Sequence, residues 1–275
     1  MTTSLQAAAT LRNGVKMPWL GLGVWKMSND AEVVNAVRAA IDAGYRSIDT
    51  AMIYRNEEGV GQAVKESGVP REELFVTTKI WNDDQGYDQA LAAFEASKRR
   101  LGLDYIDLLL IHWPGKDKFV DTWRALEKIY ADGQVRAIGV SNFKVHHLET
   151  LARHSDLAPM VNQIEFHPLL TQRDTLAYCR DHGIQLEAWS PLMQGNLDQP
   201  VLQELAAKYG KTPAQIVLRW DLQQGVVTIP KSSNPRRIAE NAELFDFSLT
   251  EDEVRRIEGL NEDRRFGADP DTFLF

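Results

Sequence analysis

The feature of this sequence that most restricts its fold is a regular alternation of short apolar segments with longer amphipathic ones. Several of the short segments are continuous apolar runs, as expected for strands that are buried on both faces. A run of such strands joined by helical segments is typical of a parallel sheet, because parallel strands need long crossover connections. The expected strands are Leu20–Trp25, Arg46–Asp49, Leu74–Lys79, Tyr105–His112, Val135–Ser141, Met160–Glu165, Ile184–Trp189 and Val226–Pro230.

The segments between these strands have the apolar spacing of amphipathic helices. In the first of them Val33, Val37 and Ile41 share one face, and Gly44 follows as a helix stop. The expected helices are Asp30–Ala43, Gln85–Leu101, Asp121–Ala131, Lys144–His154, Thr171–His182, Val201–Gln223, Arg236–Leu244 and Thr250–Leu260. We expect Val201–Gln223 to be two helices, because Thr212 followed by Pro213 suits a helix start.

Eight β-then-α units predict one closed (β/α)8 barrel, a fold of ~250 residues in a single domain. We therefore expect one domain over residues 1–275, and no linker, low-complexity tract or repeat divides it. A doubly wound open sheet is the alternative fold. Asn13 and Gly14 predict a hairpin over residues 10–18 with a type I′ turn.

Charge and composition exclude several classes of protein. The net charge of −8 disfavours nucleic acid as the main ligand, because phosphate binding needs a basic surface. No apolar run approaches the ~18 residues of a membrane span, and residues 1–10 lack the features of a secretory signal. The single cysteine, Cys179, excludes an intramolecular disulfide framework. We expect a soluble, cytoplasmic protein that binds neither nucleic acid nor membrane.

Two nucleotide-binding motifs and one metal-binding motif are absent from the sequence. After Gly21 and Gly23, the third glycine of a dinucleotide fingerprint would fall at Lys26. Before Gly210, the leading glycine of a phosphate-binding loop would fall at Leu205. The six histidines form no H-E-x-x-H pair, and we therefore expect no catalytic metal.

Four polar side chains are predicted to meet at the barrel mouth. Asp49, Lys79 and His112 end three successive expected strands, and Tyr54 follows Asp49 by five residues. Active sites of these barrels lie at the C-terminal ends of the strands. Taken singly, these residues have simpler structural explanations. Asp49 and Lys79 could be a buried ion pair, and Tyr54 and His112 could be packing residues of the core. Taken together at this face of a barrel, they predict a catalytic group.

The chemistry of these side chains suits reduction of a carbonyl. The Lys79 ammonium is expected to lower the pKa of Tyr54, so that Tyr54 can protonate a developing alkoxide. His112 can hold the carbonyl oxygen by a hydrogen bond, and Asp49 would keep Lys79 charged and oriented. The hydride would then come from a cofactor. A Schiff-base lyase or aldolase that uses Lys79 is an alternative reading of the same lysine.

Three motifs resemble the aldo-keto reductases, and the resemblance runs from about residue 10 to the C-terminus. They are the segment from Gly44 to Glu57, the segment from Leu101 to Pro114, and the segment from Ile229 to Asn241. The Trp189-Ser190-Pro191-Leu192 segment is most similar to the branch with 2,5-diketogluconate and methylglyoxal or glyoxal reductases, which is related to prostaglandin F synthases. The resemblance implies a (β/α)8 barrel with a hairpin over its base and NADPH-dependent reduction of aldehydes, α-dicarbonyls and ketones.

The resemblance also implies site residues. Asp49, Tyr54, Lys79 and His112 match the family's catalytic tetrad, with Tyr54 as the acid. The implied NADPH-binding residues are Ser141, Asn142, Gln163, Trp189, Ser190, Leu192, Lys231, Ser232, Ser233, Arg237, Glu240 and Asn241. Of these, Ser141, Asn142 and Gln163 match contacts to the nicotinamide carboxamide, and Trp189 matches the residue that stacks on the ring. Lys231, Ser232 and Arg237 match contacts to the 2′-phosphate, and Glu240 and Asn241 match adenine contacts.

Structural explanations stay open for several of these residues. Ser141 and Asn142 could cap the following helix, Trp189 could be core, and Lys231 and Arg237 could be solvated charges. Trp25, Trp81, His112 and Trp113 are expected to line the substrate pocket, which suits small-molecule carbonyl compounds. The tail over residues 262–275 could fold across the mouth, pack on the exterior or fray. We expect a monomer, and a non-catalytic barrel that only binds cofactor is a further alternative.

Overall fold

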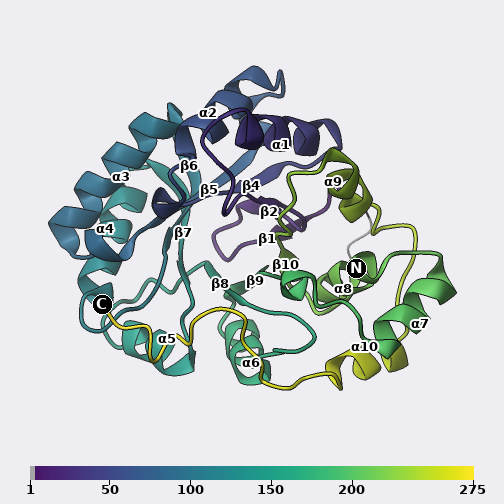
Figure 1. The fold of residues 1–275 in the computed structure, drawn as a ribbon. Coiled ribbons are helices and arrows are strands. Elements are labelled where there is room, and N and C mark those ends of the chain that lie inside the picture. Colours follow the sequence, from purple (N-terminus) through teal and green to yellow (C-terminus); the bar gives the residue numbers. More distant parts are fainter. Residues whose placement is uncertain (1–3) are drawn as a thin grey trace.

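Eight parallel strands follow one another in sequence order around the barrel in the computed structural model, which describes residues 4–275 (Figure 1). Neighbours in sequence are hydrogen-bonded neighbours in the sheet, which is the common arrangement for consecutive elements. The strands are β3 Leu22–Gly23, β4 Ser47–Asp49, β5 Phe75–Ile80, β6 Ile106–Ile111, β7 Val135–Ser141, β8 Val161–Glu165, β9 Gln185–Trp189 and β10 Val227–Thr228.

The sheet closes on itself between the last strand and the first. Leu20 pairs with Thr228 and Gly23 pairs with Lys231 as parallel bridges, and the Gly21 N–H donates to the Thr228 carbonyl at 3.0 Å. The predicted (β/α)8 barrel is confirmed, and the open doubly wound sheet is wrong. Strands β3 and β10 are shorter than expected, because along this seam regular pairing gives way to these single bridges.

Helices surround the strands (Figure 1). Those with a predicted counterpart are α1 Ala31–Asp42, α3 Tyr87–Leu101, α4 Phe119–Ala131, α5 Val145–Ala152, α6 Arg173–Asp181, α7 Pro200–Tyr209, α8 Pro213–Gln223, α9 Pro235–Ala242 and α10 Glu251–Glu258. The expected break between α7 and α8 is confirmed. Gly210 ends α7 with a φ of 63°, and Thr212 begins α8 with a capping box to Gln215.

The sequence did not predict one helix, α2 Glu57–Glu66. This segment contains Gly59 and Gly61, and each glycine inside a helix costs about 1 kcal/mol relative to alanine. Both are needed because neighbouring helices pack closely. A Cβ on Gly61 would lie 1.9 Å from the Leu101 carbonyl oxygen, and one on Gly59 would lie 2.4 Å from Val33 Cγ1.

The N-terminal hairpin is formed by β1 Ala8–Thr10 and β2 Lys16–Pro18. The predicted type I′ turn is wrong, because only Gly14, and not Asn13, has a positive φ. The Gly14 N–H donates to the Leu11 carbonyl at 2.8 Å, as in a type I turn with a glycine bulge. Asn13 instead donates to the Arg136 carbonyl at 2.9 Å, which fixes the hairpin against the N-terminal end of β7 at the base of the barrel.

The C-terminal tail runs from α10 past α6 and α5 (Figure 1). Glu165, at the end of β8, accepts the backbone N–H groups of Phe266 at 2.7 Å and Gly267 at 3.1 Å. Lys144 forms ion pairs with Asp269 and Asp271, both at 2.6 Å. These contacts place the tail along the C-terminal ends of the strands. No helix within residues 4–275 is both long and apolar enough to cross a membrane.

Candidate active site

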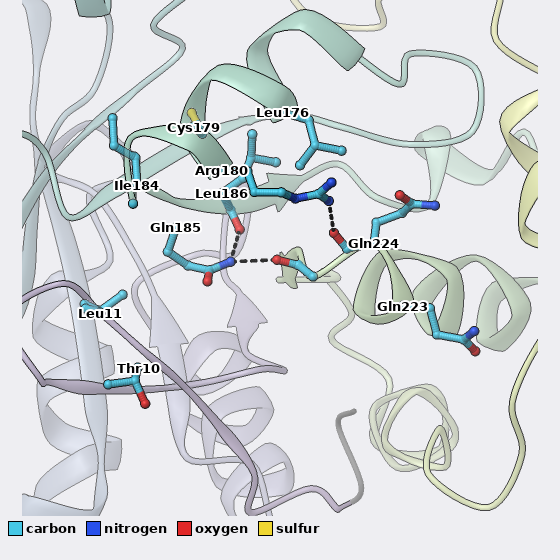
Figure 2. Close-up of a pocket in the computed structure, with 12 residues that line it drawn as sticks. Thr10, Leu11, Leu176, Cys179, Arg180, Ile184, Gln185, Leu186, Gln223 and Gln224 are labelled. Carbon is cyan, nitrogen blue, oxygen red and sulfur yellow. Dashed lines mark hydrogen bonds between the residues drawn. The ribbon is translucent and has the colours of Figure 1, made fainter.

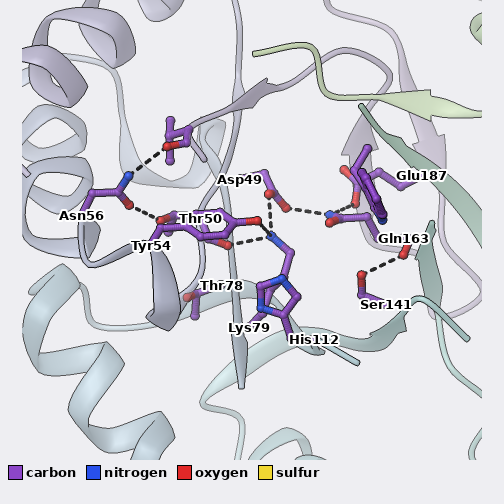
Figure 3. A network of polar contacts seen from close by, with 12 residues as sticks. Asp49, Thr50, Tyr54, Asn56, Thr78, Lys79, His112, Ser141, Gln163 and Glu187 are labelled. Carbon is purple, nitrogen blue, oxygen red and sulfur yellow. Dashed lines mark hydrogen bonds and ion pairs between the residues drawn. The ribbon is translucent and has the colours of Figure 1, made fainter. Parts of the chain in front are cut away.

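The four predicted catalytic side chains meet at the C-terminal ends of adjacent strands (Figure 3). Asp49 ends β4, Lys79 is the penultimate residue of β5, and His112 directly follows β6. Lys79 is fully buried, and its Nζ donates to Asp49 Oδ1 at 2.6 Å and to the Thr50 carbonyl at 2.9 Å. The same Nζ lies 3.5 Å from the Tyr54 hydroxyl. The ammonium therefore connects the carboxylate with the phenol.

The segment after β4 is fixed by hydrogen bonds that place Tyr54. This residue ends the 3-10 helix η1 Met52–Tyr54, which stops at Arg55 with a φ of 56°. Asn56 is fully buried and accepts from the Thr50 hydroxyl at 2.6 Å. Its Nδ2 donates to the carbonyls of Val24 and Met27. A buried asparagine with partners on two loops thus sets where the phenol lies relative to Lys79.

The expected lowering of the Tyr54 pKa is wrong in its net direction. Burial raises the pKa of Tyr54, Lys79 lowers it, and Asp49 raises it again, so that it lies above its ordinary value. Lys79 acts in the predicted sense, but desolvation of the phenolate outweighs it. Tyr54 is consequently protonated at neutral pH, which is the state that a proton donor needs.

His112 lies against Tyr54 and Trp81. Its ring meets Tyr54 edge to face with the centroids 5.8 Å apart, and Trp81 in the same way at 5.1 Å. Burial, with a contribution from Lys79, holds the pKa of His112 well below its usual range. The imidazole is therefore neutral and can donate one hydrogen bond to a substrate oxygen.

The sequence did not reveal that two further residues belong to this network. Gln163 Nε2 donates to Asp49 Oδ2 at 2.7 Å and to Glu187 Oε2 at 2.8 Å (Figure 3). Gln163 was predicted only as a cofactor contact, and Glu187 was not predicted at all. A carboxylate two residues before the end of the expected strand Ile184–Trp189 is a signal that could have identified it, because a carboxylate is rarely fully buried unless it is paired.

The residues predicted to hold the nicotinamide lie together at the ends of β7 and β9 and in the middle of β8. The Ser141 hydroxyl donates to the Gln163 carbonyl at 2.8 Å, and Asn142 Nδ2 donates to the His112 carbonyl at 2.9 Å. Trp189 Nε1 donates to Asn142 Oδ1 at 2.8 Å. Ser141 and Asn142 do not cap α5, whose N-cap is Lys144. The capping explanation is therefore wrong.

The Trp189 ring is half-buried, and Gly267 of the tail lies against its edge: a Cβ there would be 2.3 Å from Trp189 Cη2. Ser190 follows with a φ of 52°, and Leu192 begins the 3-10 helix η4 Met193–Gly195. The partly open indole, with Ser141 and Asn142 beside it, suits a flat ring that carries an amide.

The residues predicted to bind the 2′-phosphate surround the start of α9. Lys231 and Arg237 are exposed. Asn234 caps the helix by accepting the N–H groups of Arg236 and Arg237, and the Ser232 hydroxyl accepts the Asn234 N–H at 3.1 Å. Two exposed cations beside a helix N-terminus suit a phosphate dianion, although the charge of Lys231 also acts on Glu32. Ser233 is exposed next to them, Glu240 pairs with Arg236 at 3.1 Å, and Asn241 is buried.

The tryptophans predicted to line the substrate pocket have different surroundings. Trp81 packs on His112, whereas Trp25 is 49% exposed with the Lys26 ammonium 4.3 Å from its ring centroid. Trp113 packs against Phe273 of the tail, with the centroids 4.7 Å apart. The tail therefore contributes to the wall on the Trp113 side.

Two cavities lie away from these residues. One, of about 410 Å³, lies between the hairpin and α6 at the base, and its lining includes Thr10, Cys179 and Gln185 (Figure 2). The other, of about 510 Å³, lies between α5 and the tail and is lined by polar residues that include Lys144 and Arg265. Neither contains a tetrad residue.

One group of side chains in the described part of the chain has the spacing of metal ligands. His146, His147 and Asp271 bring one ligand atom each to within 4.8 Å of one another. His147 Nδ1 accepts the Lys144 N–H at 3.1 Å, so the proton of the neutral ring is on Nε2, the atom that faces Asp271. Such an imidazole is not prepared to bind a metal through Nε2.

The fold and this site define a carbonyl-reducing barrel enzyme, and the comparisons with known proteins agree. The model of the Aldo/keto reductase family matches residues 19–262. This chain belongs to the aldo/keto reductase family and is an oxidoreductase.

Among its relatives, glyoxal reductase of Bacillus subtilis is 62% identical over the whole of both chains. Methylglyoxal reductase DkgA of Escherichia coli is 51% identical over 96% of each chain. A crystal structure of a Gox0644 mutant in complex with NADPH is 44% identical, has a TM-score of 0.94, and covers 98% of this chain and 99% of that one. The family and fold predicted from the sequence are confirmed, and the expected cofactor agrees with this structural neighbour.

Proposed function

We propose that the protein reduces small aldehydes and α-dicarbonyl compounds to alcohols with NADPH. The observation that carries the proposal is the buried Lys79 ammonium, which Asp49 holds at 2.6 Å while it lies 3.5 Å from the Tyr54 hydroxyl. NADPH, when bound, supplies the hydride. Relatives named glyoxal and methylglyoxal reductase support the choice of a dicarbonyl substrate.

Each of the four side chains has a separate role at the substrate's carbonyl oxygen. His112, as a neutral imidazole, donates a hydrogen bond that orients the oxygen toward Tyr54. Tyr54 transfers its hydroxyl proton to this oxygen as negative charge develops there. The adjacent Lys79 cation stabilises the phenolate that remains, and Asp49 keeps this cation charged and in place.

The residues that would hold NADPH fall into two groups, one at strands β7 to β9 and one around α9. Trp189 would stack on the nicotinamide, and the oxygen atoms of Ser141, Asn142 and Gln163 would accept from its carboxamide nitrogen. Around α9, Lys231, Ser232, Ser233 and Arg237 would bind the 2′-phosphate, with Glu240 and Asn241 toward the adenine. Ser190 and Leu192 would contact the segment between these ends. Trp25, Trp81 and Trp113 would provide apolar walls for the substrate.

The test is NADPH consumption with methylglyoxal, followed by the loss of NADPH absorbance. We expect Tyr54→Phe to lower kcat by ~10²-fold or more, because the proton donor is lost. Tyr105→Phe is the matched control, because Tyr105 precedes β6 at the base, under Arg71, and should leave the rate unchanged. Lack of turnover by the unaltered enzyme, or full turnover by Tyr54→Phe, would refute the proposal.

The Schiff-base alternative fits the lysine less well. Burial lowers the pKa of Lys79, but Asp49 and Tyr54 raise it, and the net direction is upward. A Schiff base needs a neutral amine with a free lone pair. Borohydride trapping of methylglyoxal on Lys79 would favour that alternative. A barrel that only binds cofactor would bind NADPH without consuming it in the same assay.

The monomeric state and the cytoplasmic location predicted from the sequence are part of this proposal. Light scattering at the concentration of the kinetic assay would test the first, and fractionation of cells that produce the protein would test the second. A stable dimer would require a reconsideration of which surfaces are free.

A further inference from the structure

One buried carboxyl near the site, that of Glu187, has no role in the proposed reaction. Glu187 is completely buried on β9, and within residues 4–275 its one hydrogen-bonded side-chain partner is Gln163, whose Nε2 donates to Oε2 at 2.8 Å. Its other oxygen, Oε1, has no hydrogen-bond partner in the described part of the chain. A buried carboxyl that is half satisfied costs stability, and such a cost is common where a group has a function.

Glu187 lies in the layer of the barrel beneath the predicted nicotinamide site. It pairs in register with Gln163 of β8, and Trp189 follows two residues later on the same strand. Alternate residues of a strand point to the same face, so Glu187 and Trp189 share one face of β9. Figure 3 places Glu187 beside Gln163, on the side away from Tyr54. The Glu187 carboxyl is thus hydrogen-bonded to Gln163 and lies two residues before Trp189, and both of these residues are expected to contact the ring.

The groups that surround Glu187 act on its ionisation in opposite directions. Asp49 faces it from β4, Lys79 from β5 and Tyr54 from η1, while β10 offers only Val227 in register with it. Burial and the negative charge of Asp49 raise the pKa of Glu187, the Gln163 hydrogen bond and Lys79 lower it, and the net result is a pKa of about 8. Lys79 is already neutralised by Asp49, so a second carboxylate would leave the cluster with a net negative charge.

We propose that Glu187 couples a proton to the oxidation state of the cofactor: it is neutral with NADPH bound and ionises when NADP⁺ takes its place. This inference rests on the proposed function. The nicotinamide ring of NADP⁺ carries a positive charge that the ring of NADPH lacks, and a nearby buried carboxylate favours the charged ring. The carboxyl proton leaves to solvent, and no electron passes through Glu187. Ionised Glu187 therefore favours the oxidised cofactor.

Linkage makes the effect reciprocal and measurable. If NADP⁺ binding lowers the pKa of Glu187, a rise in pH must strengthen NADP⁺ binding relative to NADPH binding. A shift of one pKa unit on exchange of the two cofactors would change the ratio of their dissociation constants by about tenfold across the titration.

The experiment measures the Kd values of NADP⁺ and NADPH by quenching of tryptophan fluorescence, from about pH 6 to about pH 10. In the unaltered protein, we expect the ratio of the Kd for NADP⁺ to that for NADPH to fall by about tenfold through the titration of Glu187. In Glu187→Gln, which keeps the shape but not the charge, the ratio should stay constant.

Two control variants identify the titrating group. Asp221→Asn alters another fully buried carboxyl, bound to the Thr228 hydroxyl at 2.8 Å on the outer side of β10, and should keep the pH dependence. Tyr54→Phe should also keep it, since a phenol of raised pKa does not titrate in this range. Loss of the pH dependence in either control would overturn the assignment to Glu187.

Calorimetry of the unaltered protein tests the same point without a variant. NADP⁺ binding near the Glu187 pKa should release protons, seen as a binding enthalpy that depends on the buffer, whereas NADPH binding should release fewer. Equal proton release for both cofactors, or a constant Kd ratio in a protein that still reduces methylglyoxal, would refute this inference alone. A protein that binds neither cofactor would refute the proposed function as well.

Discussion

Replacement of Lys79 by methionine removes the positive charge that faces Asp49. The buried Asp49 carboxylate is then left without a counter-charge. Methionine is similar in length and adapts to irregular space, so the main loss is the three contacts of Nζ. Asp49 is 2% exposed and would keep only the Gln163 amide, at 2.7 Å, as a partner on its other oxygen. Its charge would be uncompensated inside the barrel.

The expected cost follows from this geometry. Removal of one partner of a buried pair destabilises proteins by ~3–5 kcal/mol, and the remaining Gln163 bond argues for the lower end. For 275 residues, ~3 kcal/mol corresponds to a fall in Tm of about 5 °C. Asp49→Asn/Lys79→Met carries no charge at this position and should recover most of the lost stability.

Urea denaturation and thermal melts of the two single variants and the double variant complete the cycle. Activity provides a second measurement, because both variants lacking Lys79 should lose ~10²-fold or more in kcat. Stability that returns in the double variant while activity does not would separate the two roles of the lysine. If Lys79→Met alone were as stable as the unaltered protein, the buried Asp49 carboxylate would not need the cation, and the expected cost would be refuted.

Three further predictions concern other parts of the chain. Lys231→Ala and Arg237→Ala should each raise the KM for NADPH by ~10-fold or more while changing that for NADH little. Arg124→Ala, which loses an exposed pair with Asp121 on α4, is the control, and equal losses with both cofactors would contradict the assignment. The pKa of Glu187 is raised from 4.5 to about 8, so the folded protein binds this proton more tightly than the unfolded chain does. The free energy of unfolding should therefore fall as the pH rises from 4.5 to about 8, and it should fall less steeply in Glu187→Gln. Thr212→Ala removes the N-cap of α8 and should cost ~1 kcal/mol in urea denaturation, whereas an unchanged midpoint would mean that Pro213 alone sets the helix start.

The order of the strands and most helices could be predicted because apolar periodicity and helix stops agree along the chain. The break at Gly210 and Thr212 is an example in which the local residues determine the structure. Helix α2 could not be predicted, because Gly59 and Gly61 lower its intrinsic helix propensity and are required by contacts with Val33 and Leu101. Such contacts between distant segments are invisible in a local pattern.

The tetrad could be predicted from its position at strand ends, but its electrostatics could not. The net rise of the Tyr54 pKa depends on burial, which residue spacing does not report. The link from Asp49 through Gln163 to Glu187 depends on the register of β8 against β9. The turn at Asn13 depends on the hydrogen bond to Arg136, far along the chain.

The seam between β10 and β3 has a consequence for how the chain is made. The barrel closes only through pairs such as Leu20 with Thr228, which join the beginning of the chain to its last fifth. During synthesis, the strands that carry Asp49, Lys79 and His112 leave the ribosome long before their barrel can close. Before that point the strands that carry Gln163 and Glu187 are not yet made, so they cannot cover Lys79 and Asp49. Closure is therefore the event that completes the burial of this ion pair, and amide exchange at Gly21 and Thr228, whose N–H groups bond across the seam, should report it.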